Sequence, residues 1–283
     1  MSPTQDLTIF AISIAAGVLG ALAGIGGGML VIPALTFLYG VDIRVAIGAS
    51  IVSIIATSSG AAAAYVRDRL TNLRVGMFLE LATTSGAVLG ALLAAIVAPQ
   101  LLFLLLGIVL LFSAGMQVYR LREELPPETP PSAAARALGL VSSYPDARLG
   151  REVPYAARRI GLGFVAMGFA GLISGLLGIG SGALKVAMDG AMRLPMKVST
   201  ATSNFMIGVT AAASAGIYIG RGDVDVQIAT PVALGVLAGA ILGARLLVRL
   251  RNQQVRLIFV PVLIVIALQL IARGLGLDIG FGG

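Results

Sequence analysis

The chain has 283 residues, of which 58% are hydrophobic and 12% charged, and its mean hydropathy is +0.98. A soluble domain carries about twice that share of charged residues, so this composition excludes an ordinary soluble protein and predicts a polytopic membrane protein. The net charge of +7 comes from basic residues at the ends of apolar stretches, where positive charge sets orientation, so no nucleic-acid partner is expected. Because the chain has no Cys and no His, we expect no metal, no cofactor and no enzymatic activity.

The first apolar stretch runs from Leu7 to Gly40 and is broken in its middle by a glycine motif, Gly24-Ile25-Gly26-Gly27-Gly28. As one helix, its 34 residues would be about 51 Å long, which is too long for a single crossing. Two helices of about 15 residues each, turning at the glycines, fit a hairpin that enters and leaves on the same side. Irregular backbone at that depth is tolerated only inside protein or beside a water-filled cavity.

Three ordinary membrane-spanning helices are predicted next, at residues 43–65, 75–98 and 100–119. The following segment, 120–158, is polar and contains six of the twelve prolines. Its composition predicts a solvent-exposed loop with little fixed structure.

The second half repeats this plan. A broken apolar stretch from Arg159 to Met192 precedes predicted spans at 197–219, 225–248 and 254–273. Four landmarks recur in order at an offset of 153 or 154 residues: Gly24–Gly28 and Gly178–Gly182, Val45–Ser50 and Val198–Ser203, Gly86–Ala91 and Gly239–Ala244, and Tyr65 and Tyr218. The two halves are therefore predicted to be duplicates.

The distribution of Lys and Arg predicts that the halves face opposite ways. Three Arg place the 66–74 loop in the cytoplasm, and the 120–158 loop with the adjoining Arg159 carries seven more. The 249–256 turn is predicted to be cytoplasmic, whereas its repeat partner, the Pro99–Gln100 turn, is predicted to be external. In total 16 basic residues are predicted inside, with Lys185 in the membrane and only Arg44, Arg221 and Arg273 outside.

These patterns predict an all-α polytopic membrane protein of two inverted repeats, each a glycine-broken helical hairpin followed by three transmembrane helices. The first repeat would occupy residues 1–119, a cytoplasmic polar loop 120–158, and the second, inverted repeat 159–283. We expect a multi-pass protein of the cytoplasmic (inner) membrane with both termini external. A homo-oligomer is compatible with the sequence.

The glycine motif with Pro33 after it, its copy at Gly178–Gly182, and the Thr202-Ser203 step resemble the sulfite exporter TauE/SafE family of membrane permeases. The first half departs from the family at Ala49-Ser50, where Thr-Ser is frequent. The resemblance covers nearly the whole chain except 120–158. It implies export of sulfite, or of a related sulfur oxyanion or organosulfonate; composition and spacing do not indicate that substrate.

The glycine motifs are candidates for binding the anion. A helix that restarts at Gly28 or Gly182 has unpaired N–H groups and a positive dipole end in its first turn, and glycine lets an anion approach that backbone. The alternative is that these glycines only allow a tight turn and close packing, as expected for Gly86/Gly90 and Gly239/Gly243. The candidate residues are Gly26, Gly27, Gly28, Gly180, Ser181 and Gly182.

Charged residues within apolar segments, and two polar stripes, complete the candidate site. Lys185 lies in an apolar run, where it could neutralise a bound anion or form an i,i+4 ion pair with Asp189. Glu80 could carry a coupling proton, as could Asp189, or Glu80 could instead face a cytoplasmic cavity or pair with Arg74. Matching polar stripes follow each hairpin, and their hydroxyl and amide groups suit either an anion or helix–helix contacts: Ser50, Thr202, Ser203 and Asn204.

The sequence therefore favours a secondary transporter that exports sulfite or a related sulfur-containing anion, held near the midplane by helix N-termini at the glycine turns. An anion channel, or a permease for another small anion, uses similar chemistry and remains the alternative. No phosphate-loop motif is present, so energy must come from a gradient or a partner.

Overall fold

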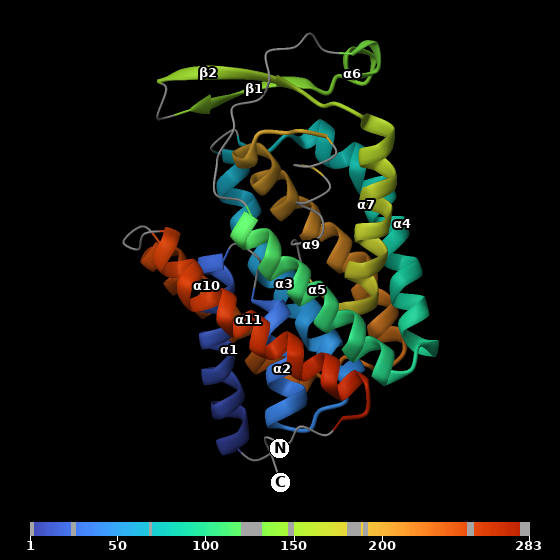
Figure 1. Ribbon diagram of the computed structural model, residues 1–283, viewed down its shortest axis with the longest axis vertical. Coiled ribbons are helices and arrows are strands. Elements are labelled where there is room, and N and C mark those ends of the chain that lie inside the picture. Colours follow the sequence, from blue (N-terminus) through green and yellow to red (C-terminus); the bar gives the residue numbers. More distant parts are fainter. Residues whose placement is uncertain are drawn as a thin grey trace.

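The structure is a computed structural model that describes residues 3–23, 27–67, 70–119, 132–146, 150–179, 188, 192–247 and 252–277. Within these residues the chain is predominantly helical (Figure 1). The elements are α1 (Pro3–Ala23), α2 (Gly28–Leu38), α3 (Ile43–Arg67), α4 (Leu73–Ile96), α5 (Pro99–Tyr119), α6 (Ala133–Ala137), β1 (Val141–Asp146), β2 (Arg151–Ala156), α7 (Ile160–Leu177), α9 (Met196–Gly220), α10 (Val226–Leu247) and α11 (Asn252–Gly274).

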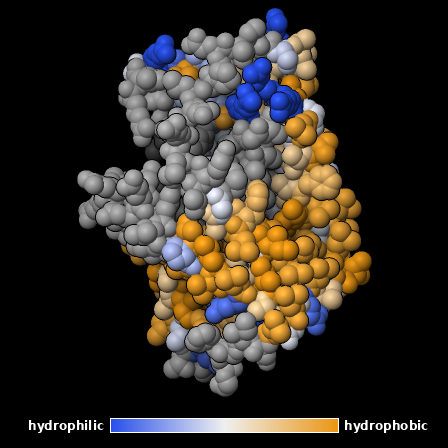
Figure 2. Space-filling view, in the orientation of Figure 1, coloured by the Kyte–Doolittle hydropathy of each residue, from blue (hydrophilic) through white to orange (hydrophobic). Residues whose placement is uncertain are grey.

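Each of the six predicted ordinary spans is a helix. Helices α3, α4 and α5 in the first half, and α9, α10 and α11 in the second, begin and end within two residues of the predicted limits. Within the described residues, three helical segments are long and apolar enough to cross a membrane: Leu73–Ile96, Ile160–Leu177 and Val226–Gly243. Where the visible face is coloured, hydrophobic residues form a broad region below the hydrophilic residues of the β-hairpin end (Figure 2). A continuous apolar surface of this kind fits lipid rather than water.

The prediction of two equal hairpin arms was wrong. Helix α1 has 21 residues and α2 has 11, and α7 has 18. The first arm is longer because the helix starts before the apolar stretch, with Pro3 in its first turn and Asp6 near the positive end of the helix dipole. At about 1.5 Å per residue, α1 is about 31 Å long, comparable with the hydrocarbon thickness of a bilayer.

The prediction that 120–158 has little fixed structure was also wrong for its described part. Strands β1 and β2 form an antiparallel pair, with Ser143 opposite Pro154 and Tyr144 opposite Val153. Alternate side chains are buried, among them Tyr144, Val153 and Tyr155, which is the pattern of a strand pair with one covered face. We call this pair the β-hairpin; Figure 1 shows it at the end of the molecule away from the start of α1.

Each of the main helix–helix contacts joins one helix of the first half to one helix of the second half. The most extensive contacts join α1 with α10, α4 with α7, α5 with α11, and α3 with α9. In the predicted repeat, α1 corresponds to α7 and α4 to α10, so the first two pairs are counterparts of one another. Helix α7 runs away from the β-hairpin, whereas α1 runs toward that end, so the two run in opposite directions along the long axis (Figure 1).

Glycines form the α1–α10 and α4–α7 crossings, which confirms the packing role predicted for Gly86/Gly90 and Gly239/Gly243. A methyl group at Gly86 would overlap the carbonyl oxygen of Gly168, and one at Gly239 would overlap that of Ile14. At the next turn, Gly90 meets Leu172 and Gly243 meets Val18. The facing helices contribute glycines as well: a methyl group at Gly171 of α7 would overlap the Thr83 carbonyl, and one at Gly17 of α1 would overlap the Val236 carbonyl. Every one of these contacts has its counterpart at the repeat offset.

These crossings predict opposite effects for two glycines of α7. Gly175→Ala places a methyl group on the carbonyl of Ala87 and should destabilise the protein by about 2 kcal/mol or more, because the backbones must separate. Gly161→Ala meets no atom within 4 Å and should be neutral or stabilising by up to about 1 kcal/mol. Melting temperatures of both purified variants test this. Equal melting temperatures would show that the crossing can relax.

Candidate functional site

The first glycine break separates α1 from α2. Helix α2 begins at Gly28 with Gly27 as its N-cap, as the sequence predicted for a helix restarting there. The Gly27 carbonyl accepts from the N–H groups of Leu30 (3.1 Å) and Val31 (3.3 Å). Helix geometry leaves the preceding N–H groups of the first turn without an intrahelical acceptor. Gly26 lies outside the described residues.

The second break begins where α7 ends. Gly178 is the C-cap, has φ +58°, and donates its N–H to the Ser174 carbonyl at 2.8 Å. The Ser174 hydroxyl donates to the Ile179 carbonyl, also at 2.8 Å. The remaining candidates of this segment lie outside the described residues: Gly180, Ser181, Gly182, Lys185 and Asp189.

Ser50 brings the two breaks together. Its hydroxyl, fully buried on α3, lies 2.9 Å from the Gly28 carbonyl and 2.8 Å from the Gly178 carbonyl. A hydroxyl has one hydrogen, so it donates to either carbonyl in turn or is shared between them. Two segments 150 residues apart in sequence therefore meet at one side chain, which we call the Ser50 junction.

Both described glycines at the first break, and Gly178 at the second, are closely packed. A methyl group at Gly28 would lie 2.6 Å from the Ser50 hydroxyl oxygen, and one at Gly178 would lie 2.7 Å from a methyl group of Ile47. One at Gly27 would overlap Val236. At Gly178 the positive φ and the nearby Ile47 carbonyl favour glycine whatever else it binds, whereas at Gly27 and Gly28 the side chains of Val236, Ser50 and Ile54 would have to shift.

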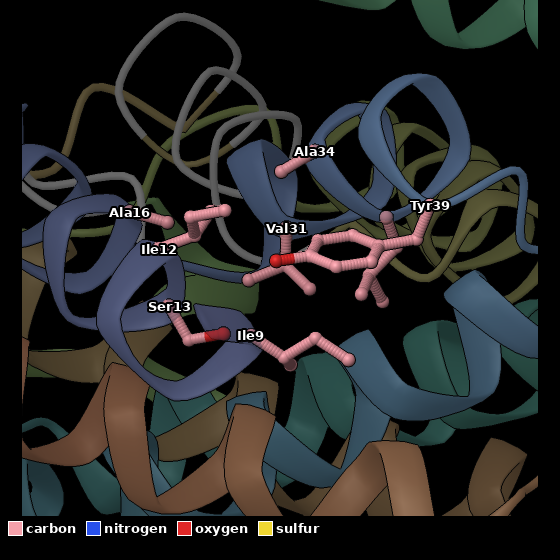
Figure 3. A pocket seen from close by; sticks show the side chains of 8 residues that line it. Ile9, Ile12, Ser13, Ala16, Val31, Ala34 and Tyr39 are labelled. Atoms are coloured by element: carbon pink, nitrogen blue, oxygen red, sulfur yellow. The ribbon is translucent and has the colours of Figure 1, made fainter. Parts of the chain in front are cut away.

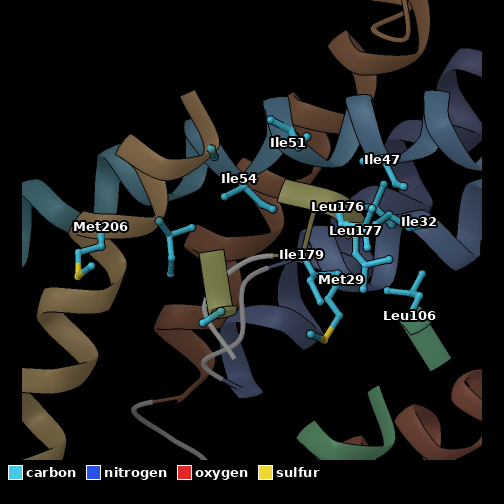
Figure 4. Close-up of a cluster of buried hydrophobic side chains, with 14 of the residues drawn as sticks. Met29, Ile32, Ile47, Ile51, Ile54, Leu106, Leu176, Leu177, Ile179 and Met206 are labelled. Atoms are coloured by element: carbon cyan, nitrogen blue, oxygen red, sulfur yellow. The ribbon is translucent and has the colours of Figure 1, made fainter. Parts of the chain in front are cut away.

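Apolar side chains surround the Ser50 junction. Met29 and Ile32 from α2, Ile47 from α3, and Leu177 and Ile179 around the second break are at most 1% exposed. Figure 4 shows these side chains gathered between the ends of their helices. The described part of the junction is therefore closed to water in this conformation.

A small crevice lies between α1 and α2, away from the junction. It is too narrow to hold a water molecule and is lined mainly by apolar side chains (Figure 3). Ser13 and Tyr39 are the polar members of its described lining, which carries no charged residue, so it does not suit a small anion.

The polar stripe on α9 makes its hydrogen bonds within the protein. The Thr202 hydroxyl accepts from the backbone N–H of Asn72 at 3.0 Å. The Ser203 hydroxyl and the Asn204 amide both donate to the Thr200 carbonyl, at 3.0 and 2.9 Å. The Thr202 contact joins α9 to the start of α4, as the helix-contact alternative predicted, whereas Ser203 and Asn204 bond within their own helix. An anion contact by Ser203 or Asn204 stays a prediction.

Asn72 and Tyr155 are hydrogen-bonded polar residues beside Thr202 that the sequence did not indicate as site residues. Asn72 caps α4 by accepting from Val75 N–H at 3.0 Å, and its amide donates to the Tyr155 hydroxyl at 2.8 Å. Burial raises the pKa of the Tyr155 phenol, which the Asn72 hydrogen bond partly opposes, so the phenol stays neutral. An Asn before an apolar helix is a recognisable cap signal, but its partner on the β-hairpin was not predictable.

Glu80 does not pair with Arg74. Its Oε1 accepts from the hydroxyls of Thr84 and Thr210, both at 2.7 Å, and so joins α4 to α9. The Arg74 guanidinium instead approaches Gly139, just before the β-hairpin.

The sequence profile of the sulfite exporter TauE/SafE family matches residues 9–270, which is most of the chain. The chain belongs to this family. The match confirms the resemblance found in the glycine motifs and extends across both halves of the membrane region.

Two relatives from Bacillus subtilis (strain 168) are similar to this TauE/SafE family member over most of their length. The probable membrane transporter protein YunE is 28% identical over 277 residues, covering 92% of this chain and 95% of the relative. The probable membrane transporter protein YdhB is 28% identical over 244 residues, covering 84% and 87%. Both are named as transporters rather than as enzymes. No solved structure is significantly similar to the chain.

The Ser50 junction predicts a difference between two buried serines of α3. Ser50→Ala removes the buried hydroxyl that links the Gly28 and Gly178 carbonyls, and should destabilise the protein by about 1 kcal/mol or more. Ser53→Ala is the matched control, because Ser53 is equally buried but donates only to the Ser50 carbonyl in its own helix. Thermal unfolding of the purified variants measures both. If the two variants unfold at the same temperature, the junction does not hold the breaks together.

Proposed function

We propose that this protein is a secondary transporter that exports sulfite, or a related sulfur oxyanion or sulfonate, across the cytoplasmic membrane. Membership of a family described as sulfite exporters and the transporter relatives support transport in general. The observation that carries the finer proposal is the Ser50 junction, where a helix N-terminus from one half and a helix C-terminus from the other meet.

The anion would bind at the N-terminal turn of α2, where N–H groups without intrahelical acceptors and the helix dipole favour negative charge. Gly26, Gly27 and Gly28 would supply that turn, and Gly180, Ser181 and Gly182 its counterpart in the second half. Lys185 would neutralise the anion, in competition with Asp189. Ser50 would position the two turns, while Thr202, Ser203 and Asn204 would complete the site after a rearrangement of α9.

The two halves form an inverted repeat in this proposal. The opposite directions of α1 and α7, and the matching glycine contacts of the α1–α10 and α4–α7 crossings, support it. Inverted repeats allow a site near the midplane to face either side by exchanging the conformations of the two halves. The described apolar surroundings of the junction are closed to water, which is one of the states that alternating access requires.

In the proposed topology the β-hairpin is cytoplasmic and both termini are external. The three Arg predicted outside are exceptions to the positive-inside rule, and each is held by carbonyls near a helix C-terminus. Arg44 donates to Ala94, Ala95 and Val97 at the end of α4. Arg221 donates to Ala91 of the same helix, and Arg273 donates to Thr36 near the end of α2. The protein therefore holds all three guanidinium groups in place.

Transport is tested by reconstituting the purified protein in liposomes and measuring anion flux. We expect saturable sulfite flux that a small alkyl sulfonate inhibits, whereas nitrate should not. Absence of sulfite and sulfonate flux from correctly folded protein would overturn the proposed substrate class.

The same assay examines Lys185. Lys185→Ala should weaken sulfite affinity by about tenfold or more, because a charged partner of the anion is lost, and Lys185→Arg should retain most of it. Arg151→Ala, on the exposed surface of β2, is the control for loss of a positive charge. Unchanged affinity in Lys185→Ala would assign Lys185 a structural role.

Topology is tested by single cysteines, because the chain has none of its own. Gln100→Cys and Ser142→Cys introduce thiols at exposed positions of the α5 start and the β-hairpin. A membrane-impermeant maleimide added to intact cells should label position 100 at once and position 142 only after permeabilisation. The reverse labelling pattern would show that the proposed orientation is wrong.

A further inference from the structure

Glu80 lies inside the membrane region on α4, seven residues after the helix begins at Leu73. That spacing places it about 10 Å along the helix. Its Oε1 accepts two hydrogen bonds of 2.7 Å, from Thr84 on the same helix and from Thr210 on α9. Its Oε2 is buried and has no hydrogen-bond partner in the part of the chain that the structure describes. Within the described residues, Oε1 thus accepts two hydrogen bonds and Oε2 accepts none.

Among the residues that the structure describes, no positive group of the neighbouring helices is placed beside this carboxylate. Helix α7, which packs on α4, carries no titratable side chain. Helix α9 carries Lys197 in its first turn and Tyr218 in its last, and the Tyr218 hydroxyl donates to the Gly175 carbonyl. On α4 itself, Arg74 approaches Gly139 instead. An ionised carboxylate held here would cost several kcal/mol, whereas a neutral carboxyl leaves only one O–H without a partner.

The two hydroxyls suit a carboxyl group better than a metal cation. Separations of 2.7 Å are those of hydroxyl-to-carboxylate hydrogen bonds. A cation would need further oxygen ligands, and within the described residues no cluster of three or more acidic side chains is present.

The site belongs to one half of the molecule. At the repeat offset of 153 residues, Glu80 corresponds to Ala233, and Thr210 corresponds to Thr57. The Thr57 hydroxyl donates to carbonyls of its own helix, Ser53 and Ile54, and binds no carboxylate. Within the described residues, only one of the two halves therefore carries a buried acid bridged across α4 and α9.

We propose that Glu80, with Thr84 and Thr210, is a proton-binding site that couples proton movement to anion transport. The proposal rests on the transport function proposed above and adds the coupling ion and its site. In the conformation described here a proton occupies Oε2 and forms the neutral carboxyl. When α4 and α9 separate, Thr210 leaves Oε1, water reaches the carboxyl, and the O–H bond breaks to release the proton. This carboxyl binds one proton in each transport cycle.

The experiment compares coupling with exchange in proteoliposomes. Wild type, Glu80→Gln and Thr210→Val are measured for sulfite accumulation driven by a pH gradient and for sulfite–sulfite exchange without a gradient. A pH dye in the lumen records proton movement; sulfite itself carries protons, so variants are compared at equal sulfite flux. Glu80→Gln should lose gradient-driven accumulation and the associated proton movement while retaining exchange. Thr210→Val should reduce accumulation by about tenfold, because the hydrogen bond to the carboxyl is lost.

Thr57→Val is the matched control, since it removes the repeat-related hydroxyl without touching a carboxyl, and it should leave coupling unchanged. Accumulation in Glu80→Gln equal to that of wild type, or a sodium gradient that drives wild type in place of the pH gradient, would overturn the proton site.

A second measurement does not depend on the substrate. The infrared carbonyl stretch of a protonated carboxyl should appear in wild type in lipid nanodiscs near neutral pH and be absent from Glu80→Gln. Its absence from wild type would overturn the inference even if sulfite is transported. Its presence without any sulfite flux in wild type would refute the proposed substrate and leave the proton site standing.

Discussion

A helix that is interrupted inside a membrane leaves N–H and C=O groups that neither lipid nor bulk water can satisfy. This protein has two such interruptions, and one hydroxyl serves both. Ser50 lies within hydrogen-bond distance of Gly28 and Gly178, and Ile47 and Ile54 from the same helix pack against those glycines. Helix α3 is thereby the support on which α2 and α7 are aligned. Helices α9 and α10 pack on α3, α4 packs on α7, and α5 and α11 pack mainly on each other.

Helices in a membrane must also pack closely on one another without a hydrophobic driving force. Lipid is as apolar as the helix surfaces, so helices associate through van der Waals contact between small residues. The crossings of α1 with α10 and α4 with α7 satisfy this by setting glycines against backbone carbonyls. The high glycine content of the chain therefore produces tight contacts at these positions rather than flexibility.

The sequence predicted the parts that depend on local pattern. Apolar length located six helices within two residues, and the small-residue pairs Gly86/Gly90 and Gly239/Gly243 were identified as contacts. It failed where polar residues take part in regular structure. Asp6 lengthens α1 beyond its apolar stretch, and prolines and polar residues hid the alternation of Tyr144, Val153 and Tyr155 in the β-hairpin.

The candidate site was predictable only in part, because its contacts join distant positions. Ser50 was a candidate ligand from its place on a polar stripe, but its reach to Gly178, 128 residues away, needs the folded structure. The same holds for Thr210, which meets Glu80 at a separation of 130 residues. Single-sequence patterns identify which groups are unusual at a given depth; they do not identify their partners.

The crossings also determine which parts of the molecule can move as one body. Where a glycine packs on a backbone carbonyl, no side chain can change rotamer to let the two helices shift. We therefore expect α1 and α10 to move as one rigid arm, and α4 and α7 as another. Each arm contains one helix from each half of the sequence. A rigid-body rotation of the first half of the sequence against the second would break the α1–α10 and α4–α7 contacts. The articulated joints must instead lie along interfaces with adjustable side chains, such as that of α3 with α9, where Ser58 covers Gly208. The boundary between moving and stationary parts therefore separates helices that belong to the same half of the sequence.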